Sequence, residues 1–279
     1  MLARLPATIA AEVPERGPDP SGLRRLARGV ALGLVLPLAL AVLWEIAAAQ
    51  GWIRVRILPP PSVILRTLGD LWASDALAQH ILATVGRVVK GFALGVVAAT
   101  VLGALTGYSD TARRLLDPTL QALRNIPSIA WVPLFILWFG IFETSKIVLI
   151  AVGTFFPVYL GLLTGIQGVD RKLVEVGRIY HLSPFSMVRR ILLPAAMPSY
   201  LTGLRSGLGL GWMFVIAAEL MGASEGLGYL LLDGQMTGNA AQILGALVLF
   251  AILGKGTDAA LEWVIRRRLA WQDGFKAGA

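Results

Sequence analysis

The order of apolar and polar residues along the chain predicts six membrane-spanning helices. A helix that crosses the hydrocarbon layer of a bilayer needs about 20 mostly apolar residues. Six stretches satisfy this requirement: residues 30–49, 81–107, 120–140, 145–165, 200–222 and 241–264. Pro127 and Pro133 interrupt the third stretch. The expected fold class is therefore an all-α membrane protein with six transmembrane helices.

The segment between the first two predicted spans contains an amphipathic pattern of its own. The run "LPPPS" stops any preceding helix, and Ser62 can cap a new one. Apolar residues then recur at helical spacing at Ile64, Leu65, Leu68, Leu71 and Trp72. Such a helix either lies at the membrane interface or packs on the protein's own outer surface.

Composition supports a membrane protein. The chain has 279 residues, of which 56% are hydrophobic and 15% charged, and its mean hydropathy is +0.70. Soluble domains carry about a quarter charged residues. The net charge is +8, which in a soluble protein would suggest nucleic acid. Here the basic residues cluster between apolar runs, so membrane orientation explains them and no nucleic-acid partner is expected.

The positions of Lys and Arg predict the orientation, because cytoplasmic loops are enriched in both. Four basic regions fall on one face of a six-span protein: Arg16, Arg24, Arg25 and Arg28; Arg113 and Arg114; Arg171, Lys172, Arg178, Arg189 and Arg190; and Arg266, Arg267 and Arg268. Residues 223–240, on the opposite face, contain neither Lys nor Arg. Both termini are thus expected in the cytoplasm. Residues 1–29 and 269–279 form tails around a membrane domain at 30–268.

Glycines recur at four-residue spacing within the predicted spans, which lets helices approach closely in lipid. The pairs and triplets are Gly91/Gly95, Gly103/Gly107, Gly161/Gly165 and Gly203/Gly207/Gly211. We expect these glycines to serve packing within one chain rather than a specific dimer seam.

Ionisable residues inside membrane spans are candidates for function. Glu219, near the outer end of the fifth predicted span, either lines a solute pathway or gate, or ends the helix near the headgroups. Trp212 on the same span is the second candidate pathway residue. Lys255 and Asp258 are three residues apart, so they can pair on one helix face.

No catalytic, metal-binding or cofactor-binding motif is present. There are no cysteines and only two widely separated histidines. The stretch "LGKGT" lacks the Ser/Thr and the first glycine of a nucleotide-binding P-loop. We therefore expect a non-enzymatic chain that binds no cofactor. If ATP drives this protein, ATP and magnesium bind to another chain.

A charged segment at about residues 170–198 separates the fourth and fifth spans and predicts two short helices. Asp170 can cap the first helix, which should end near His181 and carry Leu173, Val176 and Tyr180 on one apolar face. Ser183 and Pro184 favour a restart. The expected second apolar face consists of Phe185, Val188 and Leu192, with Ile191 beside it. Pro194 and Pro198 should limit this helix before the fifth span.

Three interpretations of this segment compete. A DNA-binding helix-turn-helix is sterically awkward so close to a bilayer. Basic side chains could touch anionic headgroups, but that does not require two helices. Docking of a cytoplasmic partner does require a shaped protrusion with apolar side chains.

The segment resembles the cytoplasmic "EAA" loop of ABC-importer permease subunits. That loop reads Glu-Ala-Ala, three residues, Gly, nine residues, Ile, one residue, Leu-Pro. Here the spacing is kept, but Val176 and Gly177 replace the two alanines and His181 replaces the glycine. The blocks "LPPPSVIL", "LRNIPSIAWVPLFILWFGIFETSKI", "AAELMGASEGLGYL" and "RRRLAWQD" extend the resemblance over residues 44–271. They are similar to the branch that imports sulfonates, taurine, nitrate and related small anions.

The resemblance implies a type I importer permease fold in the bacterial inner membrane. It also implies a homodimer, a cytoplasmic ABC ATPase dimer and an extracytoplasmic solute-binding protein. The ATPase-coupling role falls on ten positions: Leu173, Glu175, Val176, Gly177, Tyr180, His181, Phe185, Ile191, Leu193 and Pro194. An ion-coupled secondary transporter remains the alternative, although no cluster of intramembrane carboxylates suits it.

The replacement of glycine at position 181 raises a conformational question. Glycine would allow a left-handed turn without Cβ strain. Either His181 accepts that conformation at a modest cost, or the break uses Leu182 and Ser183 instead.

Overall fold

The computed structural model describes the backbone of residues 20–268 and the side chains of residues 33, 35–127 and 129–265. Within these ranges all regular structure is helical. The predicted terminal tails, apart from residues 20–29, and several of their arginines lie outside the described residues. The chain divides into two compact units, residues 1–55 and 56–279. The first unit contributes helix α1, Pro20–Ala49.

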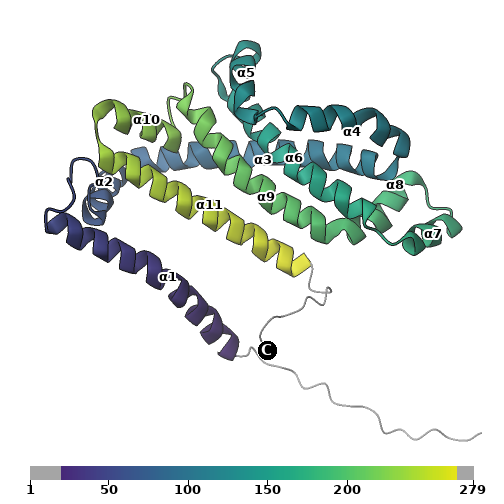
Figure 1. Ribbon diagram of the computed structural model, residues 1–279, viewed down its shortest axis with the longest axis horizontal. Coiled ribbons are helices and arrows are strands. Elements are labelled where there is room, and N and C mark those ends of the chain that lie inside the picture. Colours follow the sequence, from purple (N-terminus) through teal and green to yellow (C-terminus); the bar gives the residue numbers. More distant parts are fainter. Residues whose placement is uncertain (1–19, 269–279) are drawn as a thin grey trace, which may run out of the picture. The chain divides into compact units, whose positions relative to one another are not determined.

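Three long helices form the centre of the second unit: α3 (Ala76–Tyr108), α6 (Glu143–Gln167) and α9 (Leu193–Leu220). They lie side by side, with α6 in contact with both others (Figure 1). Fully buried side chains such as Ile150, Val158 and Leu162 project from α6 into these contacts. Helix α6 is therefore the most buried of the three.

The close approach of α6 and α9 depends on glycine. A Cβ on Gly203 would lie 2.8 Å from the carbonyl oxygen of Pro157, and one on Gly161 would lie 2.8 Å from that of Ser199. Backbone at such distances cannot give way as a flexible side chain can. Gly91 and Gly95 of α3 have equally close neighbours on α6. The predicted use of the glycines for packing within one chain is confirmed.

Helix α2 (Pro61–Ala73) packs against α11 (Ala240–Arg268), and α10 (Leu227–Thr237) packs against α11 and α9. Ile64 is buried, and Leu68 lies against Gly245. The helix thus packs on the protein's own surface through one face, while Leu65 and Trp72 on its other face remain exposed. The helix starts at Pro61 without a side-chain cap, so the prediction of Ser62 as its cap was wrong.

The third predicted span is not one straight helix. Helix α4 (Asp110–Arg124) is followed by a 3-10 turn, Ser128–Trp131, and by α5, Val132–Phe139. The two arms are bent by 88° at the break. Pro127 causes the break, because proline lacks an amide donor and disfavours helical geometry in the residue before it.

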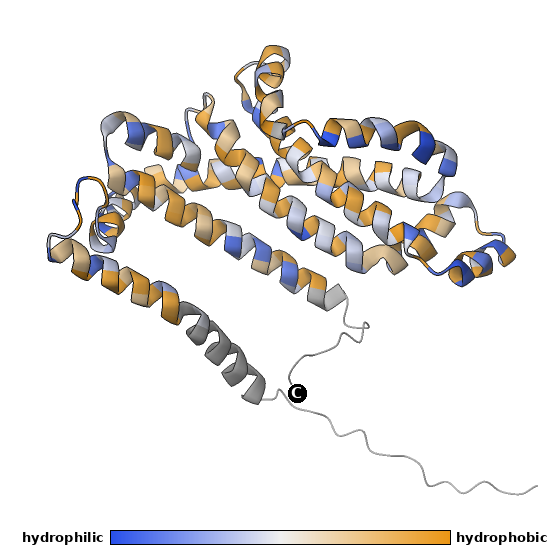
Figure 2. Cartoon of the chain, viewed as in Figure 1, coloured by the Kyte–Doolittle hydropathy of each residue, from blue (hydrophilic) through white to orange (hydrophobic). Residues whose placement is uncertain are grey.

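Four described helical segments are long and apolar enough to cross a membrane, and a fifth span arises if the bent α4–α5 pair is counted as one. These four segments are α3, α6, residues 184–220 and α11 up to Ile265. Figure 2 shows apolar residues along them, whereas α7 (Arg171–Ile179) alternates between polar and apolar residues. The described apolar part of α1, Val35–Ala49, is shorter.

Candidate functional site

The two-helix segment begins with α7, and its start follows the sequence prediction. The Asp170 side chain accepts a hydrogen bond from the amide of Lys172 at 2.9 Å. This satisfies one of the amide donors that have no partner within the helix. Helix α7 ends at Ile179, two residues before His181.

His181 forms the turn after α7 in a left-handed conformation, with φ of +49°. The amide of Leu182 donates to the carbonyl of Gly177 at 3.0 Å, which closes the helix end. Of the two predicted possibilities, His181 accepts the left-handed turn and the break does not move to Leu182. The cost to a residue with a Cβ is about 1–2 kcal/mol.

The second helix starts as predicted but does not stop where predicted. Ser183 caps α8, Pro184–Met187, by accepting from the amide of Ser186. A π-helical turn, Val188–Leu192, then leads directly into α9. The expectation that Pro194 and Pro198 limit this helix was wrong. Pro194 lies in the first turn of α9, directly after the π-turn. Proline is tolerated in a first helical turn, and a π-turn changes the hydrogen-bond pattern without ending the helix.

Gly177 brings the two short helices together. It is buried, and a Cβ there would lie 2.6 Å from Cδ1 of Ile191 and 2.7 Å from Sδ of Met187. Both atoms are near the ends of flexible side chains, so alanine fits after a small shift but a large side chain does not. A small residue at this position is therefore required by packing between α7 and the helix that follows.

An apolar face is exposed on the segment. Leu173 and Val176 are each 48% exposed on α7, Tyr180 is 75% exposed, and Phe185 on α8 is 73% exposed. We call these four residues the exposed face. Phe185 was predicted to share an apolar face with Val188 and Leu192. It does not, because Leu192 is buried.

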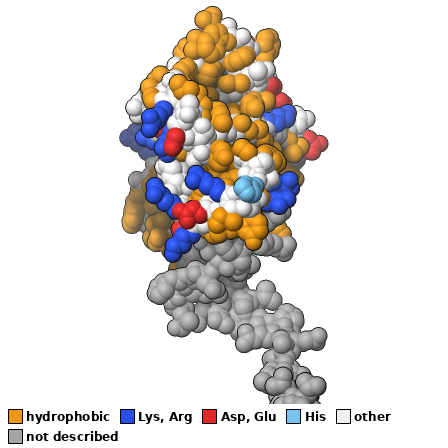
Figure 3. Space-filling model, turned by 90° about the vertical axis from the view of Figure 1, so that its right-hand side faces the viewer, with side chains coloured by type: hydrophobic (Ala, Val, Ile, Leu, Met, Phe, Trp, Pro, Cys, Tyr) orange, Lys and Arg blue, Asp and Glu red, His pale blue; other side chains and the backbone are white. Residues whose placement is uncertain are grey.

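Charged side chains are exposed on the same segment as the exposed face. Glu175 and all five basic residues of the segment are exposed: Arg171, Lys172, Arg178, Arg189 and Arg190. Figure 3 shows apolar and basic side chains side by side on this end of the molecule. Of the remaining predicted coupling residues, Ile191 and Leu193 are half-buried and Pro194 is exposed. Folding thus brings the ten predicted positions into one protrusion, some as its surface and some as its packing.

A second cluster, centred on Arg87 of α3, joins four helices. Arg87 binds Glu143 of α6 through Nε and Nη2 at 2.7 and 2.8 Å. Its Nη1 donates to Glu219 of α9 at 2.7 Å and to the carbonyl of Glu225, just before α10, also at 2.7 Å. Arg87 and Glu219 are buried. We call these interactions the Arg87 network.

The Arg87 network also holds the turn between α9 and α10. His80 Nδ1 and Thr84 Oγ1 accept from the amides of Gly226 and Leu227, and Glu219 accepts from the amide of Gly228 at 2.7 Å. Gly226 has φ of +119°, and a Cβ there would lie 2.5 Å from the Glu219 carboxyl carbon. Only glycine fits over this ion pair. The sequence singled out Glu219 but not Thr84 or Arg87, because these two partners are distant from it in sequence.

Other polar contacts link α9 and α11. Arg205 binds Asp258 through two hydrogen bonds of 3.0 and 2.9 Å. The predicted pair of Lys255 and Asp258 is confirmed at 3.7 Å. Trp212, the other predicted pathway residue, is buried and donates Nε1–H to Thr257 at 2.8 Å. Arg205 lies inside an apolar run and is far from Asp258 in sequence. The sequence therefore did not predict that these two residues pair.

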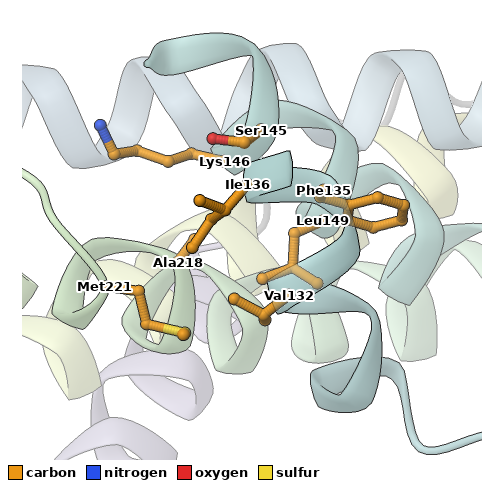
Figure 4. Close-up of a pocket in the computed structure, with 8 residues that line it drawn as sticks. All are labelled: Val132, Phe135, Ile136, Ser145, Lys146, Leu149, Ala218 and Met221. Atoms are coloured by element: carbon orange, nitrogen blue, oxygen red, sulfur yellow. The ribbon is translucent and has the colours of Figure 1, made fainter. Parts of the chain in front are cut away.

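A small cavity lies between α5, α6 and α9, and Figure 4 shows the side chains around it. Its volume is about 10 Å³, and its lining includes Val132, Leu149 and Ala218. That volume is near the minimum for one water molecule. Lys146 lies at its edge, but its ammonium group binds Glu143 at 3.0 Å. This cavity is a packing feature rather than a solute site.

The apolar helices and the protrusion between two of them define a class of protein: a multi-pass helical membrane protein with a two-helix segment that exposes apolar side chains. Residues 91–269 match the family described as binding-protein-dependent transport system inner membrane component. The chain belongs to this family of importer permease subunits.

Two relatives are named as putative aliphatic sulfonates transport permease proteins. The one from Bacillus subtilis is 38% identical over 88% of this chain and 88% of its own length. The one from Escherichia coli is 39% identical over 86% and 91%. A taurine transport system permease protein from Escherichia coli is 34% identical over 88% and 91%.

Among solved structures, an inward-facing conformation of the MetNI methionine ABC transporter contains a chain with a similar fold. The TM-score is 0.63 at 22% identity, and the match covers 70% of this chain and 97% of that one. At this identity the similarity concerns the fold alone.

Proposed function

We propose that this chain is the membrane-spanning subunit of an ATP-driven importer for a small sulfonate or a related anion. The sulfonate and taurine relatives support the substrate class. The mechanism is alternating access, without covalent chemistry in this chain. ATP and magnesium act on a separate ATPase dimer, a binding protein delivers the solute, and a second copy of the chain completes the pathway.

The membrane arrangement we propose has six spans: α1, α3, the bent α4–α5 pair, α6, α9 and α11. With six spans, Arg113, Arg114 and the basic residues of the two-helix segment share one face. That face is cytoplasmic because Lys and Arg accumulate on this side of membrane proteins. Both termini are then cytoplasmic, and the Arg87 network lies near the outer surface.

The exposed face is the observation that supports ATPase coupling. Monomeric soluble surfaces rarely gather large apolar side chains on one small protrusion, and such patches mark interaction sites. Leu173, Val176, Tyr180 and Phe185 project from helices whose relative position is fixed by Gly177 and the His181 turn. The π-turn joins the segment directly to α9. A displacement of the protrusion by a partner would therefore also move this membrane span.

Glu219 and Trp212, predicted as candidate pathway or gate residues, have a structural role in this proposal. Glu219 anchors the outer ends of α3 and α9, and Trp212 links α9 to α11. Because the carboxylate of Glu219 already accepts from Thr84, Arg87 and Gly228, it is poorly suited to carry an ion across the membrane. This disfavours the alternative of ion-coupled secondary transport.

The test is co-reconstitution with the cognate ATPase and binding protein. Glu175→Lys and Leu173→Asp should insert into membranes normally but lose binding-protein-stimulated ATP hydrolysis and uptake. Uptake that persists without any ATPase would support secondary transport instead. Normal transport by Glu175→Lys would remove Glu175 from the coupling site.

A further inference from the structure

A hollow of about 360 Å³ lies where the two-helix segment meets the membrane helices, and we call it the junction pocket. Its lining combines the end of α3, the end of α6 and both short helices: Gly107, Tyr108, Ser109, Ile166, Val174, Arg178, Leu182, Met187 and Leu192. The floor is apolar, since Ile166, Met187 and Leu192 are buried. Tyr108 and Arg178 are exposed at its edge.

Arg178 is the one charged residue among those that line the junction pocket. Arg178 forms no ion pair and no side-chain hydrogen bond with any side chain that the structure describes. Val174 and Arg178 both line the pocket from α7. Residues spaced by three and four share a helix face, so Glu175 lies one turn before Arg178 and Arg171 one turn before Val174, both outside the pocket lining. The pocket therefore offers one guanidinium, that of Arg178, above an apolar floor.

The position of the junction pocket along the membrane helices also restricts the kind of ligand that it can bind. Helix α3 ends at Tyr108 and α6 ends at Gln167, and both are candidate membrane spans. The pocket thus lies where hydrocarbon gives way to headgroups. Tyrosine is enriched at this level because one end of its side chain is apolar and the other is wet. A soluble anion would gain nothing from the apolar floor, whereas an amphiphilic anion gains from both parts.

We propose that the junction pocket binds the phosphate headgroup and glycerol region of an anionic phospholipid. Arg178 binds the phosphate, and Ile166, Met187 and Leu192 contact the apolar part. Basic pockets at the cytoplasmic ends of membrane helices bind such headgroups. This inference rests on the proposed membrane placement, but not on coupling to an ATPase.

A lipid in this pocket would act on the turn between the two short helices. Leu182 lines the pocket and follows His181 directly. Bound lipid would therefore brace the left-handed turn against the end of α3. We expect occupancy to favour one position of the exposed face relative to the membrane helices.

The test measures retained lipid on the whole permease–ATPase complex. The complex is purified from nanodiscs of phosphatidylcholine with phosphatidylglycerol, and retained phosphatidylglycerol is counted by native mass spectrometry. Loss of one cation near a membrane surface costs about 1 kcal/mol, which is about a five-fold loss of affinity. We expect this decrease for Arg178→Gln. Lys172→Gln removes an exposed cation of α7 that does not line the pocket, and it should retain lipid as the parent does.

Three results would overturn the proposal. One is equal retention of phosphatidylglycerol by Arg178→Gln and the parent complex. Another is displacement of the ligand by excess inorganic phosphate, which would identify a soluble anion as the occupant. The third is loss of ATPase co-purification by Arg178→Gln with lipid retention unchanged, which would make Arg178 an ATPase contact. Only the last concerns coupling, so failure of this proposal is distinct from failure of the proposed function.

Discussion

Nη1 of Arg87 on α3 lies 2.7 Å from Oε1 of Glu219 on α9, and both side chains are buried. A buried charge is tolerated only when it is paired and hydrogen-bonded. Here the guanidinium binds Glu143 as well, and the Glu219 carboxylate also accepts from Thr84 and Gly228. Because Glu143, Thr84 and the amide of Gly228 also bind to this pair, substitution of Arg87 or Glu219 should lower the stability of the protein.

Arg87→Ala should destabilise the protein by about 3–5 kcal/mol, because it leaves Glu219 buried without its counter-charge. Thermal unfolding in detergent measures the effect. Glu225→Gln is the matched control: the Glu225 side chain is 54% exposed and its carboxylate lies 3.7 Å from Arg87, so its loss leaves the buried pair intact. A drop in stability for Glu225→Gln as large as for Arg87→Ala would contradict this account of the Arg87 network.

Glycines of α9 should differ in their tolerance of alanine. A Cβ on Gly203 meets backbone at 2.8 Å, whereas one on Gly209 meets nothing within 4 Å. Gly203→Ala should therefore lower the unfolding temperature. Gly209→Ala should leave it unchanged or raise it, since alanine favours helix by about 1 kcal/mol. Equal effects of the two substitutions would show that α6 and α9 are not in backbone contact.

The left-handed turn at His181 predicts that a glycine variant is about as stable as the parent, whereas a valine variant is less stable. Glycine at this position relieves the Cβ strain but adds freedom to the unfolded chain, so His181→Gly should change stability by less than about 1 kcal/mol. His181→Val should destabilise the segment by about 1–2 kcal/mol, because a β-branched residue is poorly accommodated at positive φ. Limited proteolysis of the segment measures local stability. Equal protection of the valine and histidine forms would be inconsistent with the observed turn.

Packing between the short helices predicts a size limit at Gly177. Alanine needs only small shifts of Met187 and Ile191, so Gly177→Ala should retain ATPase stimulation. Gly177→Leu should separate α7 from the following helix and abolish stimulation while membrane insertion persists. If the leucine variant stimulates the ATPase normally, the relative position of the two helices is unimportant for coupling.

The sequence predicted local features of the fold and site well, because caps, turns and apolar periodicity depend on neighbouring residues. Asp170, Ser183 and the left-handed possibility at His181 belong to this group. It predicted distant pairings poorly. Nothing near Arg87 in sequence indicates Glu143 or Glu219, since the three residues meet only through the packing of α3, α6 and α9. The prolines at 194 and 198 misled for a related reason: a proline signals an interruption, but tertiary packing decides whether the helix continues beyond it.

The most direct test of the central claim compares two single substitutions on α7 in proteoliposomes that contain the ATPase and the binding protein. Val176→Asp places a charge in the exposed face, whereas Lys172→Gln alters a charged position outside it. ATP-dependent uptake of an alkanesulfonate and ATP hydrolysis are measured together. We predict that Val176→Asp loses both activities with normal membrane insertion and that Lys172→Gln retains both. Uptake and hydrolysis by Val176→Asp at the level of the parent would contradict the claim that this face couples the ATPase to transport.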